Sequence, residues 1–180
     1  MNRTSFRRLS AVLTLALLLP LAACDDSDPA GPDLVDVEAV AGTYLMTDLQ
    51  FDPQGTLPNQ ELLDALGTTD VELILTLNRS AQIVYRDPVS DLVVTLPGNF
   101  QSTVDGIRLQ WNSGSNFRDL LLSSSMEFEF DSSAGTLRFD DAAPNGVPRA
   151  RLIALVPAFE EEQLLDPTPG RLQVTFTRDD

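Results

Sequence analysis

The chain has 180 residues, with 12 arginines, 27 acidic residues and a formal net charge of −15, and it contains neither histidine nor lysine. Such an acidic chain excludes nucleic acid as a partner, because phosphates must be met by basic side chains. The missing residue types also exclude an imidazole base, a Schiff-base lysine and a Ser-His-Asp triad. We therefore expect a protein that is not an enzyme.

The first 23 residues have the order of an export signal. Arg3, Arg7 and Arg8 make a basic start, and residues 11–19 (AVLTLALLL) form an apolar run that is followed by small residues. This run is too short to span a bilayer and is typical of a secretory signal peptide. Residues 1–23 are therefore predicted to be removed.

The single cysteine, Cys24, ends the sequence Leu-Ala-Ala-Cys. This ending resembles the lipobox of bacterial lipoproteins, whose cysteine is diacylated, palmitate being a typical acyl chain, before cleavage on its N-terminal side. The resemblance implies a mature chain that begins at Cys24 and is lipid-anchored to the inner or outer membrane of a bacterial cell envelope, with its domain outside the cytoplasm. Nine arginines and 27 acids give the mature chain a net charge of −18. Acyl chains, not electrostatic adhesion to anionic lipid, must then hold the protein at the membrane.

Residues 24–37 are predicted to be the lipidated cysteine and a disordered acidic tether. The segment 25–36 (DDSDPAGPDLVD) contains prolines and a glycine and shows no apolar periodicity. The remaining residues, 38–180, have the size of one domain that can bury a proper core.

From Val40 onward the dominant hydrophobic period is two. Apolar and polar residues alternate over 71–77, 107–111, 126–131 and 171–177. Such alternation places one face of each strand in a core and the other in water, as in an antiparallel sheet. Further strands are expected at 40–51, 81–86, 91–96, 99–104, 117–123, 136–141 and 149–156.

Turn residues and two helical segments interrupt the strands. Asp105-Gly106 predicts a tight turn because glycine accepts a positive φ, and residues 97–99 (Pro-Gly-Asn) predict a longer loop. Residues 59–66 (NQELLDAL) predict a short helix that Gly67 ends. Residues 157–165 (PAFEEEQLL) predict a second one.

About ten short strands in one domain predict either a sandwich or a barrel. Gly42-Thr43-Tyr44 resembles the Gly-x-Trp motif that opens the first strand of lipocalins and related calycins, with tyrosine in place of tryptophan. Lipocalins also place a helix late in the chain, and an arginine near the end packs over the first-strand aromatic residue. Here that arginine is Arg178, with Arg171 as the alternative. We predict an all-β fold, a lipocalin-like antiparallel up-and-down β-barrel with one or two short helices, and a β-sandwich as the alternative.

The interior of this barrel is the candidate ligand site. An eight-stranded barrel is just wide enough either to be filled by side chains or to hold one small ligand. The lipocalin resemblance implies a small hydrophobic ligand, whereas many leucines and phenylalanines favour a filled interior. The alternative function is a non-enzymatic structural or protein-interaction domain with a filled core. The predicted lining residues are Tyr44, Leu73, Leu75, Leu77, Met126, Phe128, Phe130, Phe139 and Phe176.

Calcium is the one metal that this composition permits, because it takes carboxylate and carbonyl oxygens. Three acidic groups are candidates, but none has the spacing of an EF-hand loop. They are Asp140-Asp141 beside Asn145, Glu160-Glu161-Glu162, and Asp25-Asp26-Asp28. We expect no metal, no cofactor and a monomer.

The lipid anchor is directly testable at Cys24. Cys24→Ala should leave an uncleaved or soluble form that takes up no acyl chains, because no other thiol exists to accept them. Metabolic labelling with palmitate and the mass of the purified chain measure both effects in a bacterial host. Ser27→Ala, which leaves Leu-Ala-Ala-Cys intact, is the control and should be labelled normally. Unchanged acylation of Cys24→Ala would contradict the prediction.

Overall fold

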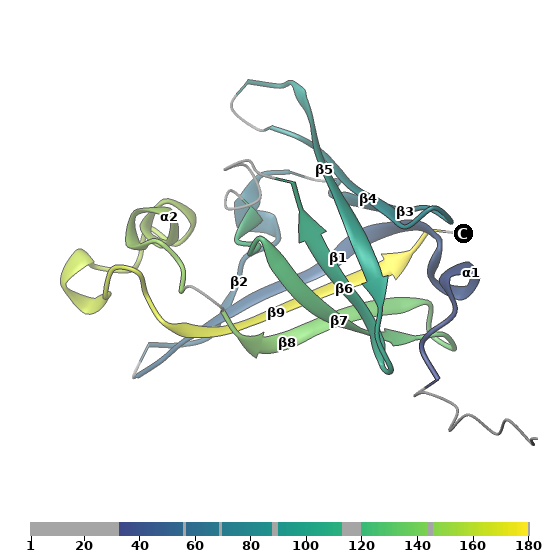
Figure 1. Ribbon diagram of the computed structural model, residues 1–180. Helices are drawn as coiled ribbons and strands as arrows, with labels where there is room; N and C mark the ends of the chain where they lie inside the picture. Colours follow the sequence, from purple (N-terminus) through teal and green to yellow (C-terminus); the bar gives the residue numbers. More distant parts are fainter. Residues whose placement is uncertain are drawn as a thin grey trace, which may run out of the picture. The chain divides into compact units, whose positions relative to one another are not determined.

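Eight antiparallel strands follow one another around a closed barrel in the computed structural model (Figure 1). They are β1 (Gly42–Pro53), β3 (Glu72–Leu75), β4 (Ser80–Arg86), β5 (Val93–Ser102), β6 (Gly106–Trp111), β7 (Ser125–Asp131), β8 (Thr136–Ala142) and β9 (Gly170–Arg178). The other elements are the short strand β2 (Gln60–Glu61), the helices α1 (Val37–Val40) and α2 (Arg149–Leu155), and the 3₁₀ turns η1 (Asp64–Leu66) and η3 (Glu161–Gln163). The structure describes residues 33–55, 57–68, 70–87, 90–112, 120–143 and 146–179.

The last strand closes the barrel onto the first. Each strand from β3 to β9 pairs with the next, and β1 pairs with β3 on one side and with β9 on the other. The β1–β9 ladder runs from Tyr44↔Arg178 to Pro53↔Gly170, with one irregularity between Met46 and Asp48. The predicted up-and-down barrel is therefore confirmed, and the sandwich is excluded.

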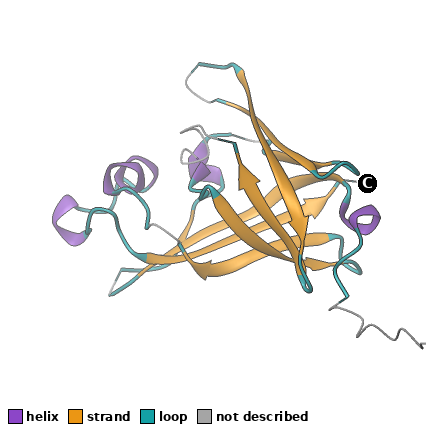
Figure 2. Cartoon of the chain, viewed as in Figure 1, coloured by secondary structure: helices purple, strands orange, loops and turns teal. Residues whose placement is uncertain are grey.

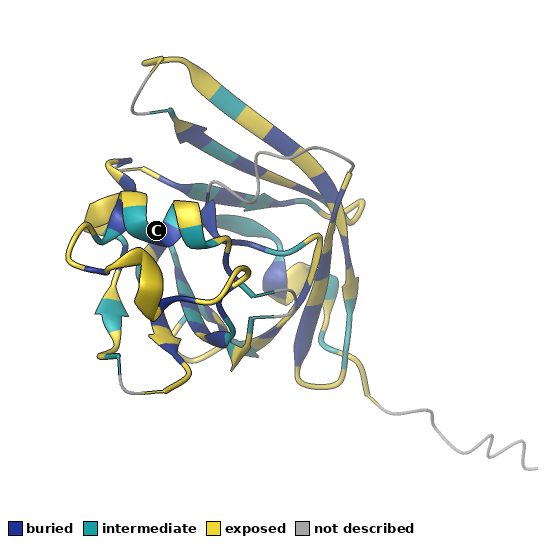
Figure 3. Ribbon diagram, turned by 90° about the vertical axis from the view of Figure 1, so that its left-hand side faces the viewer, coloured by how far each residue is buried: buried dark blue, intermediate teal, exposed yellow. Residues whose placement is uncertain are grey.

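Side chains fill the interior of the barrel. Buried and exposed residues alternate along the strands (Figure 3), as the period of two predicts. The ring of Phe128 lies 5.9 Å from those of Phe139 and Phe176, measured between centroids. The largest fully buried aromatic side chains are Tyr44, Phe51, Phe100, Phe128 and Phe176.

The two ends of the barrel are built differently. At one end, here called the closed end, strands are joined by short turns at 76–79, 103–105 and 132–135, and helix α1 lies there (Figure 2). At the other, here called the open end, the connections 54–71, 87–92, 112–124 and 143–169 are longer and include α2. Long connections on a rigid scaffold are where binding residues concentrate.

Helix α1 and Tyr44 are joined at the closed end. The side chain of Asp36 caps the helix by accepting from the Glu38 N–H, at 3.0 Å. The Tyr44 hydroxyl donates to the Val40 carbonyl at 2.7 Å. Tyr44 is fully buried, and this burial raises the pKa of its hydroxyl, which a hydrogen bond from Arg178 lowers less strongly.

Arg178 provides the arginine–aromatic contact that the lipocalin resemblance implies. Its guanidinium lies 5.2 Å from the centroid of the Tyr44 ring, and it donates to the Tyr44 hydroxyl at 2.8 Å and to the carbonyls of Ala39 and Ala41. A Cβ on Gly42 would lie 3.3 Å from the Nε of Arg178, so the glycine of Gly-x-Tyr makes room for the arginine. Arg171, the alternative partner, pairs with an aspartate elsewhere.

The ordered domain begins earlier than residue 38. Residues 33–37, predicted to belong to the tether, are part of it, because the Val35 N–H donates to the Thr103 carbonyl at 2.9 Å and Val35 and Val37 pack against the core. The predicted signal peptide, Cys24 and the tether up to residue 32 lie outside the described residues.

Glycine packing explains two differences from the predicted strands. Residues 97–99, which were predicted to form a loop, lie inside the single strand β5. The strand continues through them because Gly98 lets the Trp111 ring of β6 lie against its backbone. A Cβ at Gly98 would be 2.7 Å from that ring. Gly106 begins β6 instead of forming the turn. A Cβ at this position would meet the Phe128 carbonyl oxygen at 1.9 Å, so close strand approach, not positive φ, requires this glycine.

Three predicted elements at the open end are wrong. Residues 149–156 form helix α2 instead of a strand, because Leu152 and Leu155 are buried one turn apart among alanine, arginine and leucine, which are strong helix formers. The predicted helix 157–165 is reduced to η3. The predicted helix 59–66 is β2 followed by η1, although Gly67 does end η1 with φ of 68°.

The Arg178 contact predicts a specific loss of stability. Arg178→Ala should lower the free energy of unfolding by about 2 kcal/mol, because it removes charge-assisted hydrogen bonds and leaves helix carbonyls unpaired. Urea denaturation measures the loss. Arg86→Ala is the control, because Arg86 pairs with Asp91 at 3.2 Å on the surface and should matter by less than about 1 kcal/mol. Equal losses in the two variants would contradict the role of Arg178 at the closed end.

Candidate functional site

Most of the predicted lining residues form the core of the barrel. Phe130 is half-buried at the closed end, 6.0 Å from the Arg178 guanidinium. Leu77 is 67% exposed, so its placement in the interior is wrong. Strand β3 ends at Leu75, and a turn in which the Arg79 N–H donates to the Thr76 carbonyl at 2.9 Å breaks the alternation. The buried seven are Tyr44, Leu73, Leu75, Met126, Phe128, Phe139 and Phe176.

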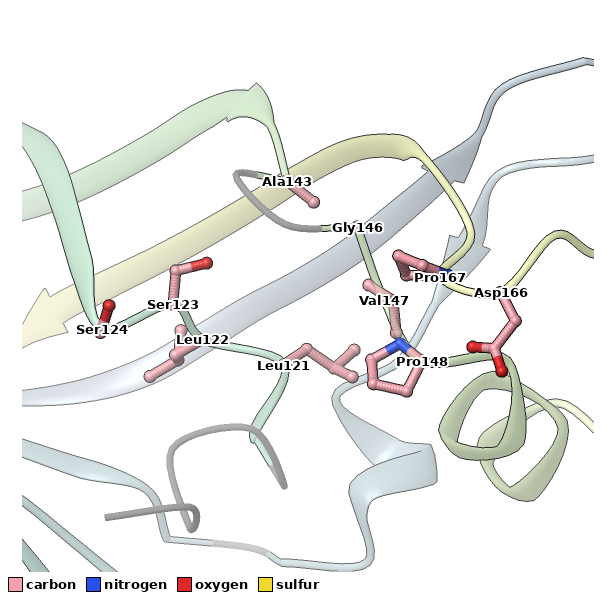
Figure 4. Close-up of a pocket in the computed structure, with 10 residues that line it drawn as sticks. All are labelled: Leu121, Leu122, Ser123, Ser124, Ala143, Gly146, Val147, Pro148, Asp166 and Pro167. Carbon is pink, nitrogen blue, oxygen red and sulfur yellow. The ribbon is translucent and has the colours of Figure 1, made fainter. Parts of the chain in front are cut away.

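A pocket of about 390 Å³ lies at the open end, and none of the nine predicted lining residues borders it (Figure 4). Its walls come from three segments that belong to two of the long connections, 112–124 and 143–169. They are residues 121–124 before β7, Ala143 and residues 146–148 between β8 and α2, and Asp166-Pro167 before β9. Convergence of several connections at one end of a barrel is the usual way to build a binding site.

The pocket walls are mainly apolar with a few polar groups. Leu121, Leu122, Val147 and two prolines supply the apolar surface, and Ser123, Ser124 and Asp166 supply polar atoms. None of the described residues that line the pocket is basic. From these described residues a bound molecule would meet hydrocarbon, hydroxyl groups and the carboxylate of Asp166.

Leu121 has a left-handed backbone, with φ of 60°. This conformation is rare for a bulky side chain and costs of order 1–3 kcal/mol. Leu120 and Leu122 are both almost fully buried and hold the strained residue between them. Residues 117–123 were predicted as a strand; 117–119 lie outside the description, and 120–122 are not strand. The unbroken Leu-Leu-Leu run, which lacks alternation, was the signal against a strand.

The opposite wall of the pocket is fixed by backbone pairing. Val147 and Thr168 exchange two backbone hydrogen bonds of 2.8 Å, and Gly146, with φ of 64°, passes so close that a Cβ would lie 2.9 Å from the Thr168 carbonyl oxygen. The Asp166 carboxylate accepts from the Arg149 N–H at 3.2 Å and so caps the start of α2. The pocket therefore has one wall of buried leucines and one of paired backbone.

The calcium candidates do not gather as a metal site. Asp140 accepts from Arg138 at 3.1 Å, from Gln173 at 3.0 Å and from Arg171, which leaves its carboxylate bound to cations. The Arg171 hydrogen bond is the main reason that the pKa of Asp140 is lowered. Among the residues that the structure describes, no group of three acidic side chains is placed to hold a metal ion. Glu160-Glu161-Glu162 lies at η3, while Asn145 and Asp25-Asp26-Asp28 lie outside the description.

Comparisons with known proteins assign no family to the chain. Neither a scan against models of protein families nor a search of functionally curated proteins returns a match. Within the described part of the chain, no helix has the length and apolar character needed to cross a membrane.

The Asp140–Arg171 pair predicts a pH-dependent contribution to stability. Because the pKa of Asp140 is lower in the folded chain, its contribution is present above the unfolded pKa of about 4 and is lost as the pH falls through the folded pKa. Asp140→Asn should thus lower the Tm modestly at pH 7, and this difference from the unaltered chain should shrink as the pH is lowered below about 4. Arg171→Gln, which removes the same pair from β9, should show the same profile in thermal unfolding. A Tm difference that is independent of pH would contradict the assignment.

Proposed function

We propose that this protein is a lipid-anchored protein of the bacterial cell envelope that binds a small apolar ligand at the open end of its barrel. The observation that carries the proposal is the pocket of about 390 Å³ with leucine, valine and proline walls. Its volume lies in the range of about 300–1,000 Å³ that small-molecule sites occupy. The aromatic residues that fill the interior favour a ligand at the mouth of the barrel over one deep inside.

The charge of the pocket favours a neutral or cationic ligand over a fatty-acid anion. Among the described residues of the lining, Asp166 is the only charged one, and none is a basic residue that could pair with a ligand carboxylate. The net charge of −18 on a mature chain that begins at Cys24 adds a long-range field of the same sign. An apolar alcohol or amine therefore fits the described walls better than a carboxylate of equal length.

The direction of the chain supports this use of the open end. The described domain begins at Asp33 beside α1, at the closed end, and Cys24 is only nine residues earlier. Nine extended residues reach at most about 30 Å. A lipid on Cys24 would therefore hold the barrel by the end opposite to the pocket and leave the pocket open to exchange.

A protein-interaction domain is the second candidate function. The filled interior favours it, because a solid barrel is a rigid scaffold whose outer surface is free to bind partners. This function does not require the pocket to be occupied.

Ligand binding is testable by thermal unfolding with decan-1-ol, decylamine and decanoate as probes. The alcohol and the amine should raise the Tm by several degrees when they are well above their Kd, and decanoate should raise it less. Asp166→Asn should reduce the difference between the Tm shifts that decylamine and decanoate produce.

Two variants, each with phenylalanine in place of an alanine, distinguish binding in the pocket from an effect on the neighbouring strand. Ala143→Phe should abolish the Tm shifts by filling the pocket that Ala143 lines. Ala142→Phe, on the exposed neighbouring residue, is the matched control and should keep them. No shift with any probe, or equal shifts in both variants, would contradict the proposed site.

A further inference from the structure

The ladder between β7 and β8 is incomplete. Only three residue pairs join these strands, and the last toward the open end is Glu129↔Arg138. Both strands continue beyond it, β7 back to Ser125 and β8 on to Ala142, and the two ribbons diverge there (Figure 1). This unpaired stretch is here called the seam.

Backbone groups of β7 point into the seam. On its other side, β7 bonds to β6 through its even-numbered residues, as the Phe130 N–H→Asp105 carbonyl bond of 2.9 Å shows. Because bonding direction alternates along an antiparallel strand, Ser125 and Glu127 direct their N–H and C=O groups toward β8. The β7–β8 ladder does not reach either residue.

The facing edge of β8 is open in the same way. Its odd-numbered residues face β9, as the bond from the Arg178 N–H to the Gly135 carbonyl at 2.8 Å indicates. Asp140 and Ala142 therefore face the seam. The Ala142 N–H is satisfied locally by the Asp141 carboxylate at 2.6 Å, which leaves the Ala142 carbonyl and both backbone groups of Asp140 toward the gap.

A groove of about 330 Å³ lies along the seam and extends past the Glu129↔Arg138 pair to Thr103 and Asp105 of the neighbouring turn. Phe128 and Phe139, whose ring centroids are 5.9 Å apart, lie below it and hold the two strands together where the backbone ladder is open. Both rings are almost fully buried. Anything that lies in the groove must therefore present small side chains to these rings.

Acidic residues outnumber basic ones on the rim of the groove, because five carboxylates and one arginine, Arg138, line it. Glu127 is paired with Arg108 at 2.8 Å, and Asp140 is paired with two arginines. Asp105, Glu129 and Asp141 also line the groove, and none of these three forms an ion pair within the described chain. A cationic occupant would therefore gain electrostatic energy that the protein itself leaves unused.

We infer that the seam binds an extended, basic segment of a partner protein, which adds as a strand between β7 and β8. Its backbone bonds to the open groups of Glu127 and Asp140, as in other strand-addition complexes. Alternate side chains point inward and outward, so small residues lie over the Phe128 and Phe139 rings. The outward residues are lysine or arginine and face Glu129 and Asp141. This inference does not depend on a ligand in the pocket.

A second copy of the chain is a poor occupant of the seam. It would bring its own acidic rim against Asp105, Glu129 and Asp141, and each copy has a net charge of −15. Like charges that face each other across paired strands are destabilising. The electrostatics thus select a basic partner, and edge-to-edge dimerisation becomes an outcome that the test must exclude.

Three fluorescein-labelled octapeptides test the inference with the purified full chain. An alternating Lys-Ser peptide should bind in fluorescence anisotropy, and an alternating Glu-Ser peptide should not. An alternating Lys-Pro peptide keeps the charge but lacks half of the backbone donors, so it should bind at least about tenfold more weakly. On binding of the Lys-Ser peptide, hydrogen exchange should slow at the amides of Glu127 and Asp140.

Charge variants distinguish peptide binding at the seam from general electrostatic attraction of a basic peptide to an acidic protein. The double variant Glu129→Gln with Asp141→Asn should bind the Lys-Ser peptide about five- to tenfold more weakly, since each substitution removes one surface ion pair with the peptide. The matched control is Glu72→Gln with Asp64→Asn, which neutralises two carboxylates away from the seam and should change affinity less than about twofold.

Four outcomes would each overturn the inference. They are absence of Lys-Ser binding, equal binding of the Lys-Pro peptide, an equal effect of the control variant, and unchanged exchange at Glu127 and Asp140. Light scattering completes the test. A dimer that the Lys-Ser peptide cannot dissociate would assign the seam to a second copy of the chain.

Discussion

The structure depends on the pairing of its first strand with its last. Nine residue pairs join β1 to β9, from Tyr44↔Arg178 to Pro53↔Gly170. This ladder pairs the first and last long strands and so closes the sheet into a barrel, which is why short strands with only one buried face are stable together. Arg178 fixes the closing ladder at its end, because its guanidinium bonds to helix α1 and covers the Tyr44 ring. At the closed end, the first and last segments of the domain are thus held together by these contacts.

Closure at β1–β9 leaves the barrel free to be incomplete elsewhere. The open end carries the long connections, and the buried leucines around the strained Leu121 form one wall of the pocket. Because only three residue pairs join β7 to β8, these two strands are separated by the seam toward the same end of the barrel. The closed end is regular and the open end is less regular. This difference suits binding at the open end, because binding segments need conformational freedom of the backbone that a continuous ladder would remove.

The sequence predicts the closed end and the core far better than the open end. Strand alternation depends on nearest neighbours in the chain, and Gly42, Tyr44 and Arg178 belong to a recognisable pattern, so barrel and arginine contact could both be anticipated. The open end depends on contacts that alternation does not encode. Residues 149–156 are apolar enough for a strand but bury Leu152 and Leu155 as a helix, and Gly98 continues β5 only because Trp111 packs on it. The pocket brings together three segments of two connections, around residues 121–124, 146–148 and 166–167, which no local pattern could place together.

The pocket and the seam are linked because they share the same two stretches of chain. Ser124 and Ala143 line the pocket, and the next residues, Ser125 and Ala142, begin the unpaired edges of β7 and β8. A strand bound at the seam would contact the edges that begin at Ser125 and Ala142, one residue away from the pocket-lining Ser124 and Ala143. Any effect of such a strand on the affinity of the pocket would be matched by an equal effect of a pocket ligand on the affinity of the seam. The two proposed activities, ligand binding and strand addition, therefore meet at one incomplete ladder.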